Sequence, residues 1–179
     1  MALRFYVAHG ASGSAASMAG HVRGLRSRGI DAEAIDLPLK KAEDAVPAFR
    51  LVVPDGREGG VAVGGQSYGG RVASLSAAEP QTAYAGLILF SYPLHPPGRP
   101  EQAPARTAHW PSIRCPVLLL SGERDPFARI ELLRACTPLL ANAELVTYPN
   151  LGHTLRPVLE DALDRTAAFL RGLDGVSAR

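Results

Sequence analysis

Three residues of the types that cooperate in nucleophilic catalysis stand out in the chain: Ser67, Asp125 and His153. A serine hydroxyl is a weak nucleophile until a neighbouring base takes its proton, and a histidine base works best when an acid orients its ring. In this interpretation Ser67 is the nucleophile, His153 the base and Asp125 the acid. Such a group forms an acyl-enzyme and then releases it to water.

Ser67 lies in the sequence Gly65-Gln66-Ser67-Tyr68-Gly69, which has the pattern G-x-S-x-G. The apolar run before it predicts a strand, and the residues after it predict a helix, which is the context that this pattern needs. A serine thrown outward on a tight strand-to-helix turn leaves no room for a Cβ at the flanking positions, which explains the glycines. A glycine-rich turn without catalytic meaning is the alternative.

The backbone around Ser67 also predicts where an oxyanion would bind. The N–H of Tyr68 opens the following helix, and a second N–H is expected from the loop after the first strand, where Ala11 is the candidate. That loop, residues 9–14, could instead cradle a phosphate. It lacks the lysine of a P-loop and does not match G-x-G-x-x-G, so no nucleotide or other cofactor is expected.

The acid and the base each have a purely structural alternative. Asp125 precedes a proline and could simply cap a helix that begins near Pro126. Glu123 lies close by and competes for the role of the acid. His153 could be an ordinary loop histidine.

The elements that must position these residues alternate between strands and helices. Strands are expected at residues 3–8, 30–37, 61–64, 84–91, 116–121 and 143–148. Helices are expected at residues 14–28, 41–53, 68–78, 129–140 and 157–172. Pro47 is tolerable in its helix only within the first turn, and Gly172 is expected to stop the last helix. This alternation predicts an α/β fold, a mostly parallel sheet of about six strands with helices on both faces and binding at the carboxyl ends of the strands.

Length and composition narrow the class of protein. The chain has 179 residues, which predicts a single domain spanning residues 1–179. The formal net charge of +2 is too small to indicate a nucleic-acid partner, and no segment is apolar enough to cross a membrane. The first residues run into a strand pattern without a signal peptide, and Cys115 and Cys136 are expected to be free thiols. We therefore expect a cytoplasmic protein with a small-molecule partner, whose oligomeric state the sequence leaves open.

One long excursion, residues 91–114, carries several prolines, which predict an ordered, extended path. It could wall one side of a substrate pocket, or it could be a surface loop whose tryptophan covers the core. Metal binding by His95 and His109 is not expected, because no further ligand is spaced to complete a site. The candidate pocket residues are His9, Gly10, Tyr92, His95 and Trp110.

Taken together, the motifs resemble the α/β-hydrolase superfamily over nearly the whole chain. They are His9-Gly10, the G-x-S-x-G sequence, Gly122-Glu123-Arg124-Asp125-Pro126 and Gly152-His153, with serine, aspartate and histidine in the order typical of the superfamily. Residues 92–98 and 124–127 are most similar to a compact group of predicted hydrolases, related to dienelactone hydrolases and to the hydrolase-like part of a chromatin-complex subunit. Compared with the superfamily, the opening antiparallel hairpin and a large lid are missing.

The resemblance implies a serine hydrolase for a small or medium ester, thioester or related acyl compound. The relation to a chromatin-complex subunit leaves open a non-catalytic binding or scaffold module. Transfer of the acyl group to an acceptor other than water would use the same three residues. A long-chain lipase is not expected, because no amphipathic lid is visible.

Overall fold

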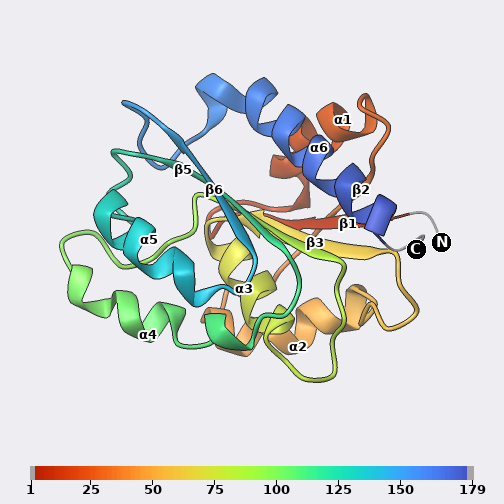
Figure 1. Cartoon of the computed structure of the whole chain (residues 1–179), viewed down its shortest axis with the longest axis horizontal. Coiled ribbons are helices and arrows are strands. Elements are labelled where there is room, and N and C mark those ends of the chain that lie inside the picture. The colour runs from red at the N-terminus through yellow and green to blue at the C-terminus, as the bar shows by residue number, and fades with distance from the viewer. Residues whose placement is uncertain (1–2, 177–179) are drawn as a thin grey trace.

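The computed structural model describes residues 3–176, and within them six strands form one fully parallel sheet in the order β2-β1-β3-β4-β5-β6 (Figure 1). The strands are β1 (Arg4–Ala8), β2 (Asp31–Ile35), β3 (Val61–Gln66), β4 (Gly86–Phe90), β5 (Val117–Gly122) and β6 (Ala143–Tyr148). Parallel neighbours need crossover connections, and helices supply them here. The predicted α/β class and strand number are confirmed.

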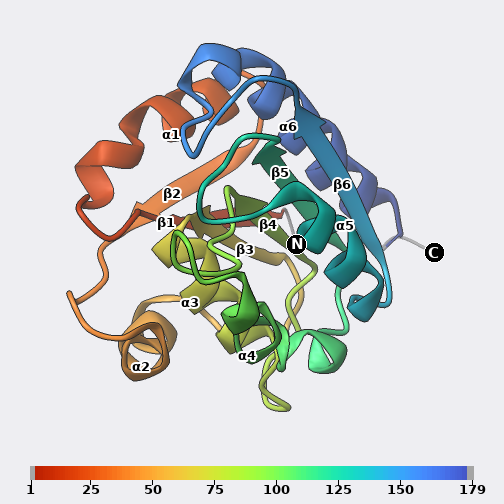
Figure 2. The same ribbon diagram turned by 90° about the vertical axis from the view of Figure 1, so that its left-hand side faces the viewer.

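Helices cover both faces of the sheet, as Figure 2 shows, with α1 and α6 on one face and α2, α3 and α4 on the other. The helices are α1 (Ala19–Arg26), α2 (Ala42–Val52), α3 (Tyr68–Ala77), α4 (Ala103–Thr107), α5 (Ile130–Cys136) and α6 (Leu159–Val176). Within residues 3–176, no helix combines the length and the apolar character that crossing a membrane requires.

The alternation of side chains along the strands creates two hydrophobic cores. In β1, Phe5 and Val7 point to the face covered by α1 and α6, whereas Tyr6 and Ala8 point to the face covered by α2 and α3. The central strand β4 is buried along its whole length, because both of its faces are covered. Burial on both sides makes the centre of the sheet a rigid base for the loops at its carboxyl edge.

Several predictions about the helices are wrong, two at helix ends and one within a helix. The helix expected at residues 14–28 is split into a 3₁₀ turn, Ala15–Met18, and α1. Pro47 lies in the interior of α2 rather than in its first turn. The last helix begins with a 3₁₀ turn, Arg156–Val158, and continues past Gly172, because Leu173 extends the apolar stripe of α6 onto the core.

The excursion between β4 and β5 is ordered but not extended, contrary to the expectation from its prolines. It forms two short 3₁₀ turns, Pro100–Gln102 and Trp110–Ser112, with α4 between the first and the second. Each of these helical pieces has a proline in its first two positions, where the missing N–H costs nothing. Prolines at these positions therefore start helices instead of preventing them.

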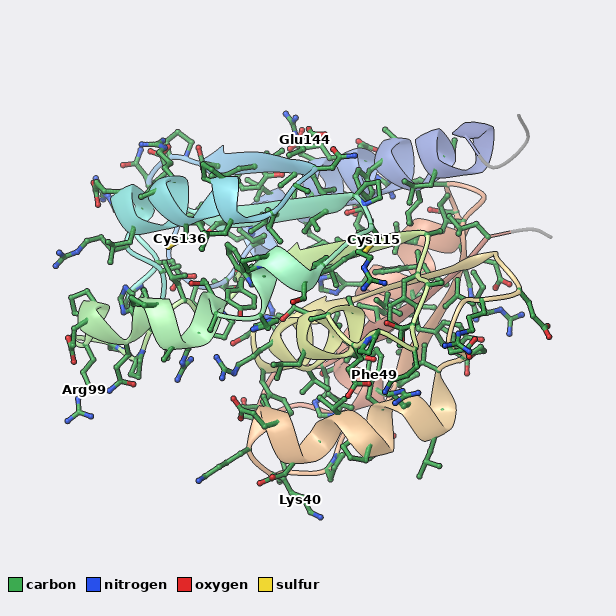
Figure 3. The ribbon with its side chains drawn as sticks, turned by 60° about the horizontal axis from the view of Figure 1, so that its bottom comes forward. Lys40, Phe49, Arg99, Cys115, Cys136 and Glu144 are labelled. Atoms are coloured by element: carbon green, nitrogen blue, oxygen red, sulfur yellow. The ribbon has the colours of Figure 1, made fainter. Side chains whose placement is uncertain are left out.

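Both cysteines are free thiols, and Figure 3 shows Cys115 and Cys136 apart from each other. Burial raises the pKa of the Cys115 thiol to about 12, so that it stays protonated at neutral pH. A protonated thiol is a poor nucleophile. Cys115 is therefore a poor candidate for a nucleophile.

Trp110 anchors the excursion, because its side chain is fully buried and its ring packs edge-on against Tyr92 with the centroids 5.1 Å apart. We expect Trp110→Ala to lower the free energy of unfolding by about 3–5 kcal/mol, since it leaves a large cavity. Trp110→Phe keeps an aromatic ring against Tyr92 and should cost about 1–2 kcal/mol. Urea denaturation followed by far-UV circular dichroism measures both values, and equal costs for the two variants would contradict this anchoring role.

Candidate active site

Ser67 occupies the sharp turn between β3 and α3, with φ 49° and ψ −112°. A Cβ on Gly65 would lie 2.4 Å from the carbonyl carbon of Gly69, and one on Gly69 would lie 2.6 Å from that of Ala8. Such separations are too short for real atoms, so both glycines are required sterically, as the sequence predicted. The strained backbone of Ser67 pushes its side chain out from the carboxyl edge of the sheet.

His153 follows β6, and its imidazole bridges the two other residues singled out in the sequence. Its Nε2 lies 2.8 Å from Ser67 Oγ, and its Nδ1 lies 2.8 Å from Asp125 Oδ2. In the neutral tautomer that fits both contacts, Ser67 donates to Nε2 and Nδ1–H donates to the carboxylate. The ring of Phe127 packs against the imidazole with the centroids 4.5 Å apart, which limits its rotation.

Both carboxylate oxygens of Asp125 make hydrogen bonds, which fix the carboxylate in the orientation that contacts His153. Oδ2 faces His153, and Oδ1 accepts a hydrogen bond of 2.8 Å from the backbone N–H of Phe127. The carboxylate is fully buried, whereas the His153 side chain is 26% exposed. Asp125 does not cap α5, because that helix begins at Ile130 after Arg129.

Glu123 points to different partners. Its Oε1 accepts hydrogen bonds from Arg134 Nη2 at 2.8 Å and from Thr147 Oγ1 at 2.9 Å. These contacts hold Glu123 over β6 and the neighbouring α5. In this geometry Asp125, and not Glu123, contacts the imidazole.

Backbone hydrogen bonds join the loops that carry Asp125 and His153. Glu123 N–H donates to Tyr148 O at 3.0 Å, and Arg124 N–H donates to Leu151 O at 2.8 Å. A Cβ on Gly122 would lie 2.3 Å from the carbonyl oxygens of Leu151 and Gly152. Because Gly122 has no side chain, the loops that carry Asp125 and His153 can approach closely enough to form these hydrogen bonds.

A cavity of about 350 Å³ opens beside Ser67. Its lining comes from the loop after β1, the start of α2, the first turn of α3, the excursion and the loop after β5. The residues are Ala11, Lys40, Lys41, Ala42, Glu43, Ser67, Tyr68, Arg71, Pro93, Pro96, Arg106 and Phe127. Ala11 and Tyr68, whose N–H groups were the candidates for an oxyanion hole, thus border the same space as the serine. The excursion contributes one wall, as one of its two interpretations proposed.

The five candidate pocket residues lie outside this lining. Tyr92 and Trp110 are buried in the core on the α3 side, where the Tyr92 hydroxyl donates to Arg106 O at 2.6 Å. Gly10 borders a second cavity, of about 260 Å³, together with Gln66 and Thr154. Tyr92 and Trp110 therefore stabilise the core and do not line the cavity beside Ser67.

His9 and His95 are both buried, and each ring links two loops. His9 Nε2 accepts from Leu37 N–H at 3.0 Å, which leaves Nδ1–H to donate to Gly10 O at 2.7 Å. His95 repeats this arrangement, with Nε2 accepting from Arg129 N–H at 3.0 Å and Nδ1 facing Pro96 O at 2.8 Å. His9 thereby braces the loop that carries Ala11, and His95 braces the loop that carries Asp125.

His109 is also engaged, since its Nε2 lies 2.8 Å from Ser74 Oγ. Burial and the nearby Arg71 lower the pKa of His109 to about 4, so that its ring is neutral at neutral pH. Among residues 3–176, no group of three or more histidine, cysteine, aspartate or glutamate side chains could hold a metal ion.

The sequence interpretation missed most of the cavity lining. Arg71 stands four residues after Ser67, and the i, i+4 spacing of a helix could have placed it on the same face. Lys40, Lys41 and Arg106 come from segments far from Ser67 in the chain. No local pattern in the sequence connects these three residues with the serine.

Comparisons with known proteins agree with this architecture. A protein-family model described as an alpha/beta hydrolase domain matches residues 36–177. A search of curated protein sequences finds no significant match. No comparison bears on the resemblance to a chromatin-complex subunit, which stays a prediction.

Several solved structures are similar in fold. A monoacylglycerol lipase from Paleococcus ferrophilus is 13% identical, with a TM-score of 0.81, covering 95% of this chain and 94% of its own. Esterase 2 from Thermogutta terrifontis, phosphorylated by paraoxon, is 18% identical, with a TM-score of 0.73 and coverage of 94% and 82%. A dienelactone hydrolase from Anabaena variabilis is 20% identical, with a TM-score of 0.70 and coverage of 96% and 86%.

Proposed function

Because the chain belongs to the alpha/beta hydrolase domain family, we propose that it is a serine hydrolase acting on small or medium carboxylic esters or thioesters. The observation that carries this proposal is the hydrogen-bonded series Ser67–His153–Asp125, with both contacts at 2.8 Å, beside a cavity. The similar folds of a lipase, an esterase and a dienelactone hydrolase support ester chemistry. The cavity of about 350 Å³ favours a compact acyl group.

In the proposed reaction, Ser67 Oγ attacks the acyl carbonyl carbon while its proton passes to His153 Nε2. The imidazolium that forms is stabilised by Asp125 through Nδ1–H. The carbonyl oxygen becomes an oxyanion, which the N–H groups of Tyr68 and Ala11 would bind. Collapse of the intermediate breaks the bond to the leaving group, which takes the proton from His153.

The second half of the reaction repeats these steps with water. His153 takes a proton from the water as its oxygen attacks the acyl-enzyme, and returns that proton to Ser67 Oγ when the acid product leaves. The partial exposure of His153 supports access of water to the acyl-enzyme. An acceptor other than water would reach the acyl-enzyme by the same route. Analysis of the products therefore distinguishes acyl transfer from hydrolysis.

We expect a small fluorophosphonate to form a single covalent adduct on Ser67, detected by intact mass and located by peptide mapping. Activation of the hydroxyl depends on the imidazole, so the rate of labelling should fall at least about 100-fold in His153→Ala. Arg99→Ala, at an exposed position of the excursion, is the matched control and should label like the wild type. A folded protein without an adduct would instead support a non-catalytic binding or scaffold module.

A further inference from the structure

The cavity beside Ser67 is strongly basic. Four of the residues that line it, Lys40, Lys41, Arg71 and Arg106, carry positive charge, and only Glu43 carries negative charge. The chain as a whole has a net charge of only +2, so the excess around this cavity is a local feature. A basic cavity attracts anions and concentrates them near the reacting group.

Arg71 places one of these charges a single helical turn from the nucleophile. Its backbone N–H donates to Ser67 O at 3.0 Å, so the two residues stand on the same side of α3. Its side chain is only 14% exposed; Nη2 donates to the Glu43 carboxylate, while Nη1 is buried without a partner among the described residues. Arg71 lines the cavity beside Ser67, and its guanidinium group has more donors than the single carboxylate of Glu43 engages, so an oxyanion bound in the cavity can accept from it as well.

Arg106, which belongs to α4 in the excursion, lines the same cavity. Its Nη1 donates to Pro93 O at 2.9 Å, and its own carbonyl accepts the Tyr92 hydroxyl, so backbone and side chain are both held. Burial, followed by the nearby charge of Arg71, lowers the pKa of the Arg106 guanidinium. Two partly buried guanidinium groups close enough to repel each other form a favourable place for an anion.

We propose that Arg71 and Arg106 form a subsite for a carboxylate on the acyl part of the substrate, so that the preferred substrates are monoesters of dicarboxylic acids. This inference rests on the proposed serine hydrolase function. Ser67 would attack the ester carbonyl at one end of the acyl chain, while the guanidinium groups bind the free carboxylate at the other end. The forked donors of arginine suit a planar carboxylate.

The charge balance favours a carboxylate over a phosphate monoester. Glu43 neutralises one of the two guanidinium groups, so the inner part of the cavity retains one uncompensated charge. A carboxylate carries one charge, whereas a phosphate monoester carries nearly two at neutral pH. Lys40 and Lys41 are exposed at the rim and can attract the anion from solution.

The test compares two p-nitrophenyl esters of equal chain length, the monoester of adipic acid and the neutral hexanoate. The wild type should hydrolyse the adipate monoester with a kcat/KM at least tenfold higher, and high salt should reduce this preference. The ratio of the two kcat/KM values should fall at least tenfold in Arg106→Gln and in Arg71→Gln. Glu43→Gln removes the competing carboxylate and should raise the ratio.

Arg99→Gln is the matched control, since Arg99 is an exposed residue of the same excursion. Figure 3 shows Arg99 at the outer end of the excursion, away from Lys40 beside α2. The ratio should be the same in this variant as in the wild type. Equal loss in Arg99→Gln and Arg106→Gln would mean that general charge, and not a subsite, sets the preference, and would overturn the proposal.

A binding measurement separates failure of the subsite from failure of catalysis. In Ser67→Ala, adipate monomethyl ester should bind, as measured by calorimetry, and Arg106→Gln added to this variant should weaken the binding at least tenfold. If the wild type hydrolyses the neutral hexanoate as efficiently as the adipate monoester, the subsite is overturned and the hydrolase function is retained. Binding of the anion without labelling of Ser67 by fluorophosphonate would retain the subsite and overturn the hydrolase. Tighter binding of inorganic phosphate than of the monoester would overturn the choice of a carboxylate.

Discussion

Replacing Ser67 with alanine is expected to lower kcat for a p-nitrophenyl ester by about 10⁴–10⁶-fold, because the acyl-enzyme can no longer form. The fold should persist, since the described side-chain contact of Ser67 is the hydrogen bond to His153. The residual rate then comes from binding and from the oxyanion hole. Steady-state kinetics measure the loss, and thermal melting followed by circular dichroism checks the fold.

The double variant sharpens this prediction. Residues that act as one unit have non-additive effects, so Ser67→Ala combined with His153→Ala should be no slower than Ser67→Ala alone, within about threefold. If the two residues contributed independently, the fold-losses in kcat of the two single variants would multiply in the double variant. If the fold-losses in kcat of the two single variants multiply in the double variant, the assignment of the nucleophile is refuted. A folded Ser67→Ala variant with activity within tenfold of the wild type would also refute it.

Asp125→Asn is expected to lower kcat by about 10³–10⁴-fold while leaving the loop intact. The asparagine oxygen can still accept the N–H of Phe127, so the turn survives. Its amide group, however, can donate toward His153 Nδ1, which favours the tautomer that cannot accept the proton from Ser67. The buried position of the carboxylate makes the loss of its charge felt directly by the imidazole.

Glu123→Gln is the matched comparison, because this residue follows the same strand and has the same kind of side chain. Its hydrogen bonds reach Arg134 and Thr147, not His153, so kcat should stay within about threefold of the wild type. Steady-state kinetics on both variants decide between the two carboxylates. A large loss in Glu123→Gln with normal activity in Asp125→Asn would reverse the assignment.

The arrangement of Ser67, Asp125 and His153 in the candidate active site was largely predictable, because it depends on local sequence and on one general property of parallel sheets. Strand-like runs before Ser67, Asp125 and His153 were visible in the sequence, and the carboxyl ends of parallel strands meet at one edge. The glycines flanking Ser67 were predicted from steric requirements, and the separations found at Gly65 and Gly69 agree with them. The order of elements and the α/β class followed from the alternation of apolar patterns.

The positions where helices begin and end were less predictable, since they depend on contacts between distant segments. Gly172 has the local character of a helix stop, but packing of Leu173 against the core continues α6 beyond it. Prolines in the excursion are as compatible with the first turns of helices as with an extended chain. Only the path of the excursion over the core decides between these conformations.

The sequence by itself determined the fold class, the turn that carries Ser67 and the edge of the sheet where the candidate active site lies. The tertiary structure alone decided which carboxylate contacts His153, because Asp125 and Glu123 follow the same strand and differ only in direction. It also decided which side chains line the cavity. Tyr92 and His95 are turned into the scaffold, whereas Arg106 reaches the cavity beside Ser67 from a distant segment. The direction of a side chain from a loop is set by what packs beneath that loop, and no local pattern of residues encodes this.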